Sequence, residues 1–80
     1  MILQLISEDK LRITFDFDEL CDMELSFSTI DYKDVKTRQL LWEAIDDAKR
    51  ETGFNPEGAK LLVKAFPGKG GGLSLYVTQI

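Results

Sequence analysis

A run of acidic residues, Asp16, Asp18, Glu19, Asp22 and Glu24, is the first candidate for chemistry in this sequence. Such carboxylates could bind a hard cation or supply a general acid and a general base. The run lacks the D-x-[DN]-x-[DN]-G pattern and distal glutamate of a calcium loop, and no second cluster supplies converging ligands. We therefore interpret it as a solvated helix start that the helix dipole favours, and expect no metal site.

Cys21 is the single thiol of the chain, which contains no histidine. A nucleophilic cysteine would lack an imidazole to activate it, and one cysteine cannot complete a conventional zinc site. We expect Cys21 to be a buried structural thiol among core residues.

A third candidate is the glycine-rich segment Gly68–Ser74, GKGGGLS. A phosphate-binding loop needs GxxxxGK[ST] between a strand and a helix. Here the lysine precedes the glycines and a strand-like segment follows, which favours an ordinary hairpin loop. The sequence thus predicts no catalytic residue, no cofactor and no metal, and we expect the chain not to be an enzyme.

The composition of the chain limits which classes of protein it can belong to. The chain has 80 residues, 44% of them hydrophobic, which is enough for one small core, and residues 1–80 are expected to form one domain. Ten basic and fourteen acidic residues give a net charge of −4, which argues against a nucleic-acid or anionic-membrane binder. No apolar run is long enough to span a membrane, and Met1 opens directly on strand-like sequence. With a single cysteine, these features predict a soluble, cytoplasmic domain.

The longest predicted element is an amphipathic helix from Tyr32 to Gly53, with Asp34 or Asp31 as N-cap and Gly53 as its end. On a helical wheel one apolar sector contains Thr37, Leu41, Ala44, Ile45 and Ala48, with Leu40 and Trp42 at its rims. Asp46 and Arg50 have the spacing of a favourable i,i+4 ion pair.

Four segments around this helix read as strands. They are Met1–Ile6, Leu11–Phe17, Lys60–Phe66 and Leu73–Ile80. The second alternates strictly, and we expect Leu11, Ile13, Phe15 and Phe17 on its core face.

A short helix is predicted over DELCDM, with Asp16 or Asp18 as its cap. We expect it to face the core with Leu20, Cys21 and Met23, and an irregular stretch follows it to Tyr32. The predicted fold is α+β, with a four-stranded, mainly antiparallel sheet in ββααββ order and both helices on one face. Because the last strand reaches the final residue, we expect the chain to be excised from a longer protein.

The predicted long helix contains LLWEAIDDA, from Leu40 to Ala48, after the lead-in Thr37-Arg38-Gln39. This stretch resembles the central helix of the MecA adaptor family, negative regulators of genetic competence. The resemblance continues through Phe54, Pro56-Glu57-Gly58, the strand near Leu61 and the closing LSLYVT, and it is weakest from Asp16 to Ile30.

The resemblance implies an N-terminal substrate-recognition domain. Family members are adaptors that deliver proteins, a competence transcription factor among them, to a Clp-type ATP-dependent unfoldase and its protease. A separate C-terminal domain of these adaptors engages the unfoldase. The implied role is regulated proteolysis through protein binding.

For the binding surface we expect Phe27, Ile30 and Tyr32 together with Trp42, because apolar side chains in an irregular segment often bind partners. Trp42 could instead close the edge of the core. A target segment could also add as a strand to a sheet edge. The alternative function is a self-associating or regulatory interaction module with no link to a protease. An acid–base enzyme using Asp16 to Glu24 is a weaker alternative.

Overall fold

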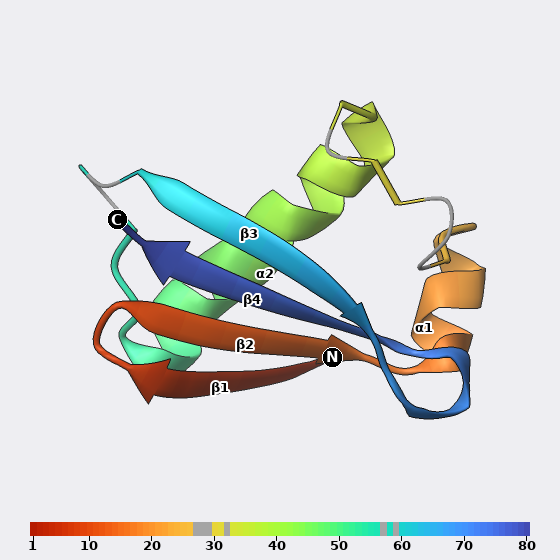
Figure 1. Cartoon of the computed structure of the whole chain (residues 1–80), viewed down its shortest axis with the longest axis horizontal. Helices are drawn as coiled ribbons and strands as arrows, with labels where there is room; N and C mark the ends of the chain where they lie inside the picture. The colour runs from red at the N-terminus through yellow and green to blue at the C-terminus, as the bar shows by residue number, and fades with distance from the viewer. Residues whose placement is uncertain (27–29, 32, 57, 59) are drawn as a thin grey trace.

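The structure, a computed structural model, describes residues 1–26, 30–31, 33–56, 58 and 60–80. These residues form an α+β fold with a four-stranded antiparallel sheet, one long helix and one short helix (Figure 1). The elements are β1 (Ile2–Ser7), β2 (Lys10–Phe15), α1 (Phe17–Asp22), α2 (Val35–Thr52), β3 (Leu61–Pro67), the 3-10 turn η1 (Lys69–Gly71) and β4 (Leu73–Gln79). The predicted class, the antiparallel sheet and the two helices are therefore confirmed, with η1 added to the predicted order.

The strands lie in the order β1-β2-β4-β3, and every pairing is antiparallel. Two hairpins, β1–β2 and β3–β4, therefore join through their second strands, β2 and β4. The first hairpin has a register shift between Leu5 and Ser7. The turn η1 closes the second hairpin, as predicted for the glycine-rich loop. This order leaves β1 and β3 as the two edges of the sheet.

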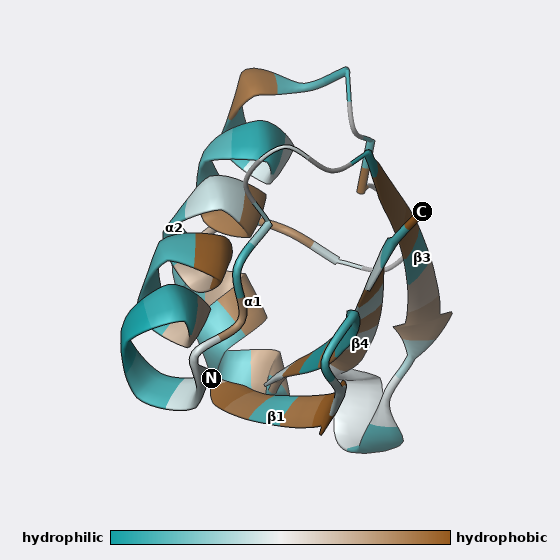
Figure 2. Cartoon of the chain, turned by 90° about the vertical axis from the view of Figure 1, so that its left-hand side faces the viewer, coloured by the Kyte–Doolittle hydropathy of each residue, from teal (hydrophilic) through white to brown (hydrophobic). Residues whose placement is uncertain are grey.

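The core lies between α2 and one face of the sheet, and Figure 2 shows the helix and the sheet as two layers. The two central strands supply its largest group of buried side chains: Leu11, Ile13, Phe15, Leu73, Leu75 and Val77. Ala44 and Ala48 of α2 are fully buried one turn apart, and their small side chains leave room for large residues of the sheet. Leu20 of α1 and Phe54, which follows α2, complete this core.

Helix α2 has two of the predicted caps, Asp34 and Gly53, and begins at Val35, inside the predicted range that opens at Tyr32. The Asp34 side chain caps it by accepting a hydrogen bond from the Lys36 amide, and Gly53 ends it in the left-handed conformation at φ 78°. Two details differ. Leu40 is buried and Leu41 only partly so, because the helix is rotated slightly toward Leu40. Arg50 pairs with Asp47, three residues earlier, and not with Asp46.

Two predictions around α1 are wrong. Strand β2 ends at Phe15, and Phe17 begins α1 with its side chain exposed, so Phe17 does not join the core face. Cys21 is also exposed and is not a buried structural thiol. A six-residue helix at the end of a sheet buries only a narrow stripe, here Leu20, and the next residue is rotated about 100° away from it.

Among the described residues, no helix combines the length and the apolar character needed to cross a lipid bilayer.

Candidate functional site

The outward face of α2 carries the first candidate surface. Trp42 is 55% exposed and Val35, two helical turns earlier, is 57% exposed, so both indole and isopropyl groups face solvent on one stripe. A shallow depression of about 520 Å³ surrounds them, and its other lining residues are Arg38, Gln39, Glu43 and Asp46. Trp42 is not among the described side chains that pack against the core, and its exposed ring is available to a partner.

The structure does not bring the four predicted binding residues into one described site. Ile30 is half-buried and packs against the core, and it is not among the residues that line the Trp42 depression. Phe27 and Tyr32 lie outside the described residues. The segment next to Ile30 is tied to α2, because the Asp31 amide donates to the buried Thr37 hydroxyl at 3.4 Å. Trp42 is thus the member of the predicted set with a described, solvent-facing position.

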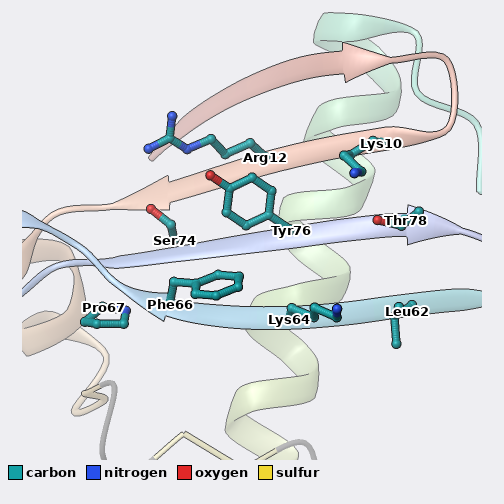
Figure 3. A pocket seen from close by; sticks show the side chains of 9 residues that line it. All are labelled: Lys10, Arg12, Leu62, Lys64, Phe66, Pro67, Ser74, Tyr76 and Thr78. Carbon is teal, nitrogen blue, oxygen red and sulfur yellow. The ribbon is translucent and has the colours of Figure 1, made fainter.

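A second candidate surface is the face of the sheet opposite α2, which we call the open face. It is hollowed by a pocket of about 550 Å³ over β2, β4 and β3 (Figure 3). The strand register arranges its side chains in rows across the sheet. One row runs Arg12, Tyr76, Lys64, and the next runs Lys10, Thr78, Leu62. A third row, Thr14, Ser74, Phe66, follows on the other side of the first.

The centre of the open face is an aromatic pair beneath a guanidinium. The rings of Phe66 and Tyr76 meet edge to face, with centroids 5.5 Å apart and planes at 86°. The Arg12 guanidinium carbon lies 5.8 Å from the Tyr76 centroid, within the range of a cation–π contact. Figure 3 shows the tyrosine ring between Arg12 and Phe66. These contacts hold three side chains from three strands in one arrangement before any partner binds.

The pocket of the open face is lined by basic residues although the chain is acidic. The described residues that line it include Lys10, Arg12 and Lys64 and no aspartate or glutamate. The whole chain has a net charge of −4. This surface was not predicted from the sequence, although alternation puts Arg12 on the face of its strand away from the core and groups Leu62, Lys64 and Phe66 on one face of theirs. Alternation within each strand was the available signal, but assembling Arg12, Lys64 and Tyr76 requires the strand order.

The acidic run has structural roles in α1. The Asp16 carboxylate accepts from the Glu19 amide at 2.7 Å, and the Glu19 carboxylate accepts from the Asp16 amide at 3.0 Å, which is a complete capping box. Glu19 also pairs with the amino group of Met1, and Glu24 pairs with Lys36 at 3.0 Å. Across the described residues, no three His, Cys, Asp or Glu side chains gather to hold a metal ion. The interpretation of Asp16 as a helix cap is confirmed.

Comparison with known proteins places this fold and sequence in one family. The family model described as negative regulator of genetic competence (MecA) matches residues 1–80. A solved structure described as the substrate binding domain of MecA is similar with a TM-score of 0.74 and 22% identity, over 99% of this chain and 86% of that chain. A search of curated proteins gives no match. At this identity the structural likeness shows the shared fold, whereas the family match spans all the residues that form the sheet and both helices. The chain belongs to the MecA family.

Proposed function

We propose that this chain recognises substrate proteins and presents them for delivery to a Clp-type ATP-dependent unfoldase and its protease. The family match over residues 1–80 is the observation that carries the proposal. The fold shared with a structure described as the substrate binding domain of MecA supports it. On this proposal the chain is the N-terminal domain of a longer cytoplasmic adaptor, and a competence transcription factor is one candidate substrate. It acts by binding and catalyses no reaction itself.

We place the substrate contact at the outward face of α2, centred on Trp42. A tryptophan can bury a large area at little cost in side-chain entropy, and such residues dominate the energetics of many interfaces. The exposed Val35 extends the apolar surface along the helix. Phe27, Ile30 and Tyr32, from the segment of the sequence that leads to α2, stay in the proposal as further candidate contacts. The competing mode is addition of a substrate strand to β1 or β3, the edges of the sheet.

The test is affinity capture from an extract of the source cells, with the immobilised chain as bait and mass spectrometry as the readout. Wild type is compared with Trp42→Ala and with the matched control Glu51→Ala, which removes an exposed side chain from the last turn of α2. Circular dichroism first confirms that both variants fold. We expect a small set of proteins to be captured by wild type and Glu51→Ala and lost with Trp42→Ala.

Other outcomes discriminate among the alternatives. Capture that survives Trp42→Ala but is lost when proline is placed in β3 would support strand addition. Capture of only further copies of the chain, with sedimentation that depends on its concentration, would support the self-associating module and contradict the adaptor.

A further inference from the structure

We infer that the open face of the sheet is a docking site for an acidic segment of a partner protein, with carboxylates on both sides of an apolar side chain. The inference rests on the proposed protein-binding function and adds a surface and a chemistry to it. It concerns the side of the sheet opposite α2, so it is separate from the Trp42 surface.

The spacing of the basic residues on this face would allow them to bind two carboxylates of one extended segment. Arg12 and Lys64 both pair with Tyr76, one from each side, so they stand two strand spacings apart, about 10 Å. Lys10 lies two residues from Arg12 on the same strand, about 7 Å along it. An extended segment that crosses the strands can therefore place one carboxylate near Arg12 or Lys10 and a second near Lys64.

The Tyr76 ring lies between Arg12 and Lys64, and two apolar side chains lie beside Lys64. The Phe66 side chain is 48% exposed and Leu62 is 43% exposed, both on β3, and they flank Lys64 on the same face. An aliphatic or aromatic side chain of the partner would bury these groups against the Tyr76 ring. Apolar side chains next to the cations are the reason to expect alternating acidic and apolar residues in the partner.

Charge complementarity selects an acidic partner. Among the described residues, the pocket lining has three cations and no carboxylate, so an incoming anion meets attraction without repulsion from this lining. The guanidinium of Arg12 is already oriented by Tyr76, and its buried Nε has no hydrogen-bond partner among the described residues. Arg12 therefore enters a complex with much of its side-chain freedom already lost, which reduces the entropy cost of binding.

Single-stranded nucleic acid is the other polyanion that aromatic and basic residues on a sheet can bind. The open face offers few cations for a phosphate backbone, and the molecule as a whole repels one with a net charge of −4. A protein segment with a few carboxylates fits this limited charge better.

The experiment measures fluorescence anisotropy with three labelled probes: a twelve-residue peptide of glutamates interleaved with leucine and phenylalanine, its glutamine counterpart, and a twelve-nucleotide single-stranded RNA. The proteins are wild type, the double variant Lys10→Glu with Lys64→Glu, and Lys33→Glu. Lys33 precedes the N-cap of α2, where a glutamate is favourable for the helix, so this control changes charge away from the open face.

We expect the glutamate peptide to bind wild type and Lys33→Glu within twofold of each other, and at least tenfold more weakly to the double variant. Affinity should fall as salt rises, and amide shifts in NMR spectra should map to β2, β4 and β3. Equal binding of the glutamine peptide, binding of RNA alone, unchanged affinity of the double variant, or no binding would each overturn the inference. If the glutamate peptide fails while Trp42-dependent capture persists, the acidic-segment inference is wrong and the proposed function stands; if capture also fails, both are wrong.

Discussion

The rings of Phe66 on β3 and Tyr76 on β4 meet edge to face, with centroids 5.5 Å apart, on the face of the sheet that no described helix covers. They are diagonal neighbours across the strands, because Phe66 pairs with Ser74 and Tyr76 with Lys64. Pairs at this spacing are within reach of aromatic side chains. The contact fixes a hydrophobic surface in place on an otherwise solvated side of the sheet.

A double-mutant cycle on this pair tests whether the rings interact beyond simple burial. Phe66→Leu, Tyr76→Leu and the double variant should show a coupling free energy of about 0.5–1.5 kcal/mol in urea denaturation. A parallel cycle with Val35→Ala and Tyr76→Leu serves as control and should be close to additive, since Val35 is exposed on the outward face of α2 and lines a different pocket from Tyr76. Additivity in the Phe66 cycle would show that the two rings only share a surface.

Two aromatic residues at α2 should differ sharply in their contribution to stability. Phe54 is 1% exposed and lies in the core, and Phe54→Ala should lower the free energy of unfolding by about 3–5 kcal/mol. Trp42→Ala should lower it by about 1 kcal/mol or less, because more than half of that side chain is already in water. Chemical denaturation of both variants gives the comparison. If Trp42→Ala lowers the free energy of unfolding by several kcal/mol, Trp42 is part of the core and is not the centre of the proposed binding surface.

The end of the β3–β4 hairpin depends on one glycine that touches β2. A Cβ built on Gly72 would meet the Phe15 carbonyl oxygen at 2.5 Å, too close for any substitution without movement of the backbone. Gly72→Ala should therefore destabilise the protein by about 2–3 kcal/mol and speed amide exchange where Phe15 pairs with Leu73.

Gly70→Ala is the matched control for that variant. Gly70 has φ 62° and nothing within 4 Å of a built Cβ, so alanine there meets only backbone strain of about 1–2 kcal/mol. In Gly70→Ala, the amide exchange rates of Phe15 and Leu73 should equal those of the wild type. Similar exchange in both variants would contradict the close approach of Gly72 to β2.

The capping box of α1 should be measurable in spite of the short helix. Asp16→Ala removes the acceptor for the Glu19 amide and should lower stability by about 1 kcal/mol. Asp22→Ala is the control, because Asp22 lies in the last turn, where a carboxylate opposes the helix dipole and its removal should be neutral or slightly stabilising. Thermal unfolding of the two variants provides the test. Equal losses would mean that the acidic residues act only through the overall charge.

Local patterns were sufficient to predict most elements of this fold. The alternation in β2 and the 3.6-residue periodicity of α2 identify their buried faces, and Asp34 and Gly53 mark the ends of α2. The errors lie where two elements meet. Asp16 and Asp18 are both possible helix caps and the alternation continues to Phe17, so the sequence leaves the end of β2 undecided between Phe15 and Phe17. The exposure of Cys21 depends on which side of a six-residue helix faces the sheet.

The two candidate surfaces also differ in whether they could be predicted from local sequence patterns. Trp42 could be singled out because its position at the rim of a helical stripe is a property of one segment. The open face could not, since Arg12 and Lys64 are far apart in the sequence and meet across Tyr76 only in the order β2-β4-β3. Periodicity shows which residues of one strand share a face, but only the long-range strand pairing brings these three side chains together.

The most direct test of the proposed adaptor function is the half-life of a captured protein in cells, measured by pulse-chase. The comparison uses the wild-type strain, a strain carrying Trp42→Ala in the gene for this chain, a strain without the unfoldase, and the combination of the last two changes. We predict that each single change lengthens the half-life several-fold and that combining them adds nothing further. An unchanged half-life in both single strains, despite direct binding of the captured protein to the chain, would contradict delivery to the protease.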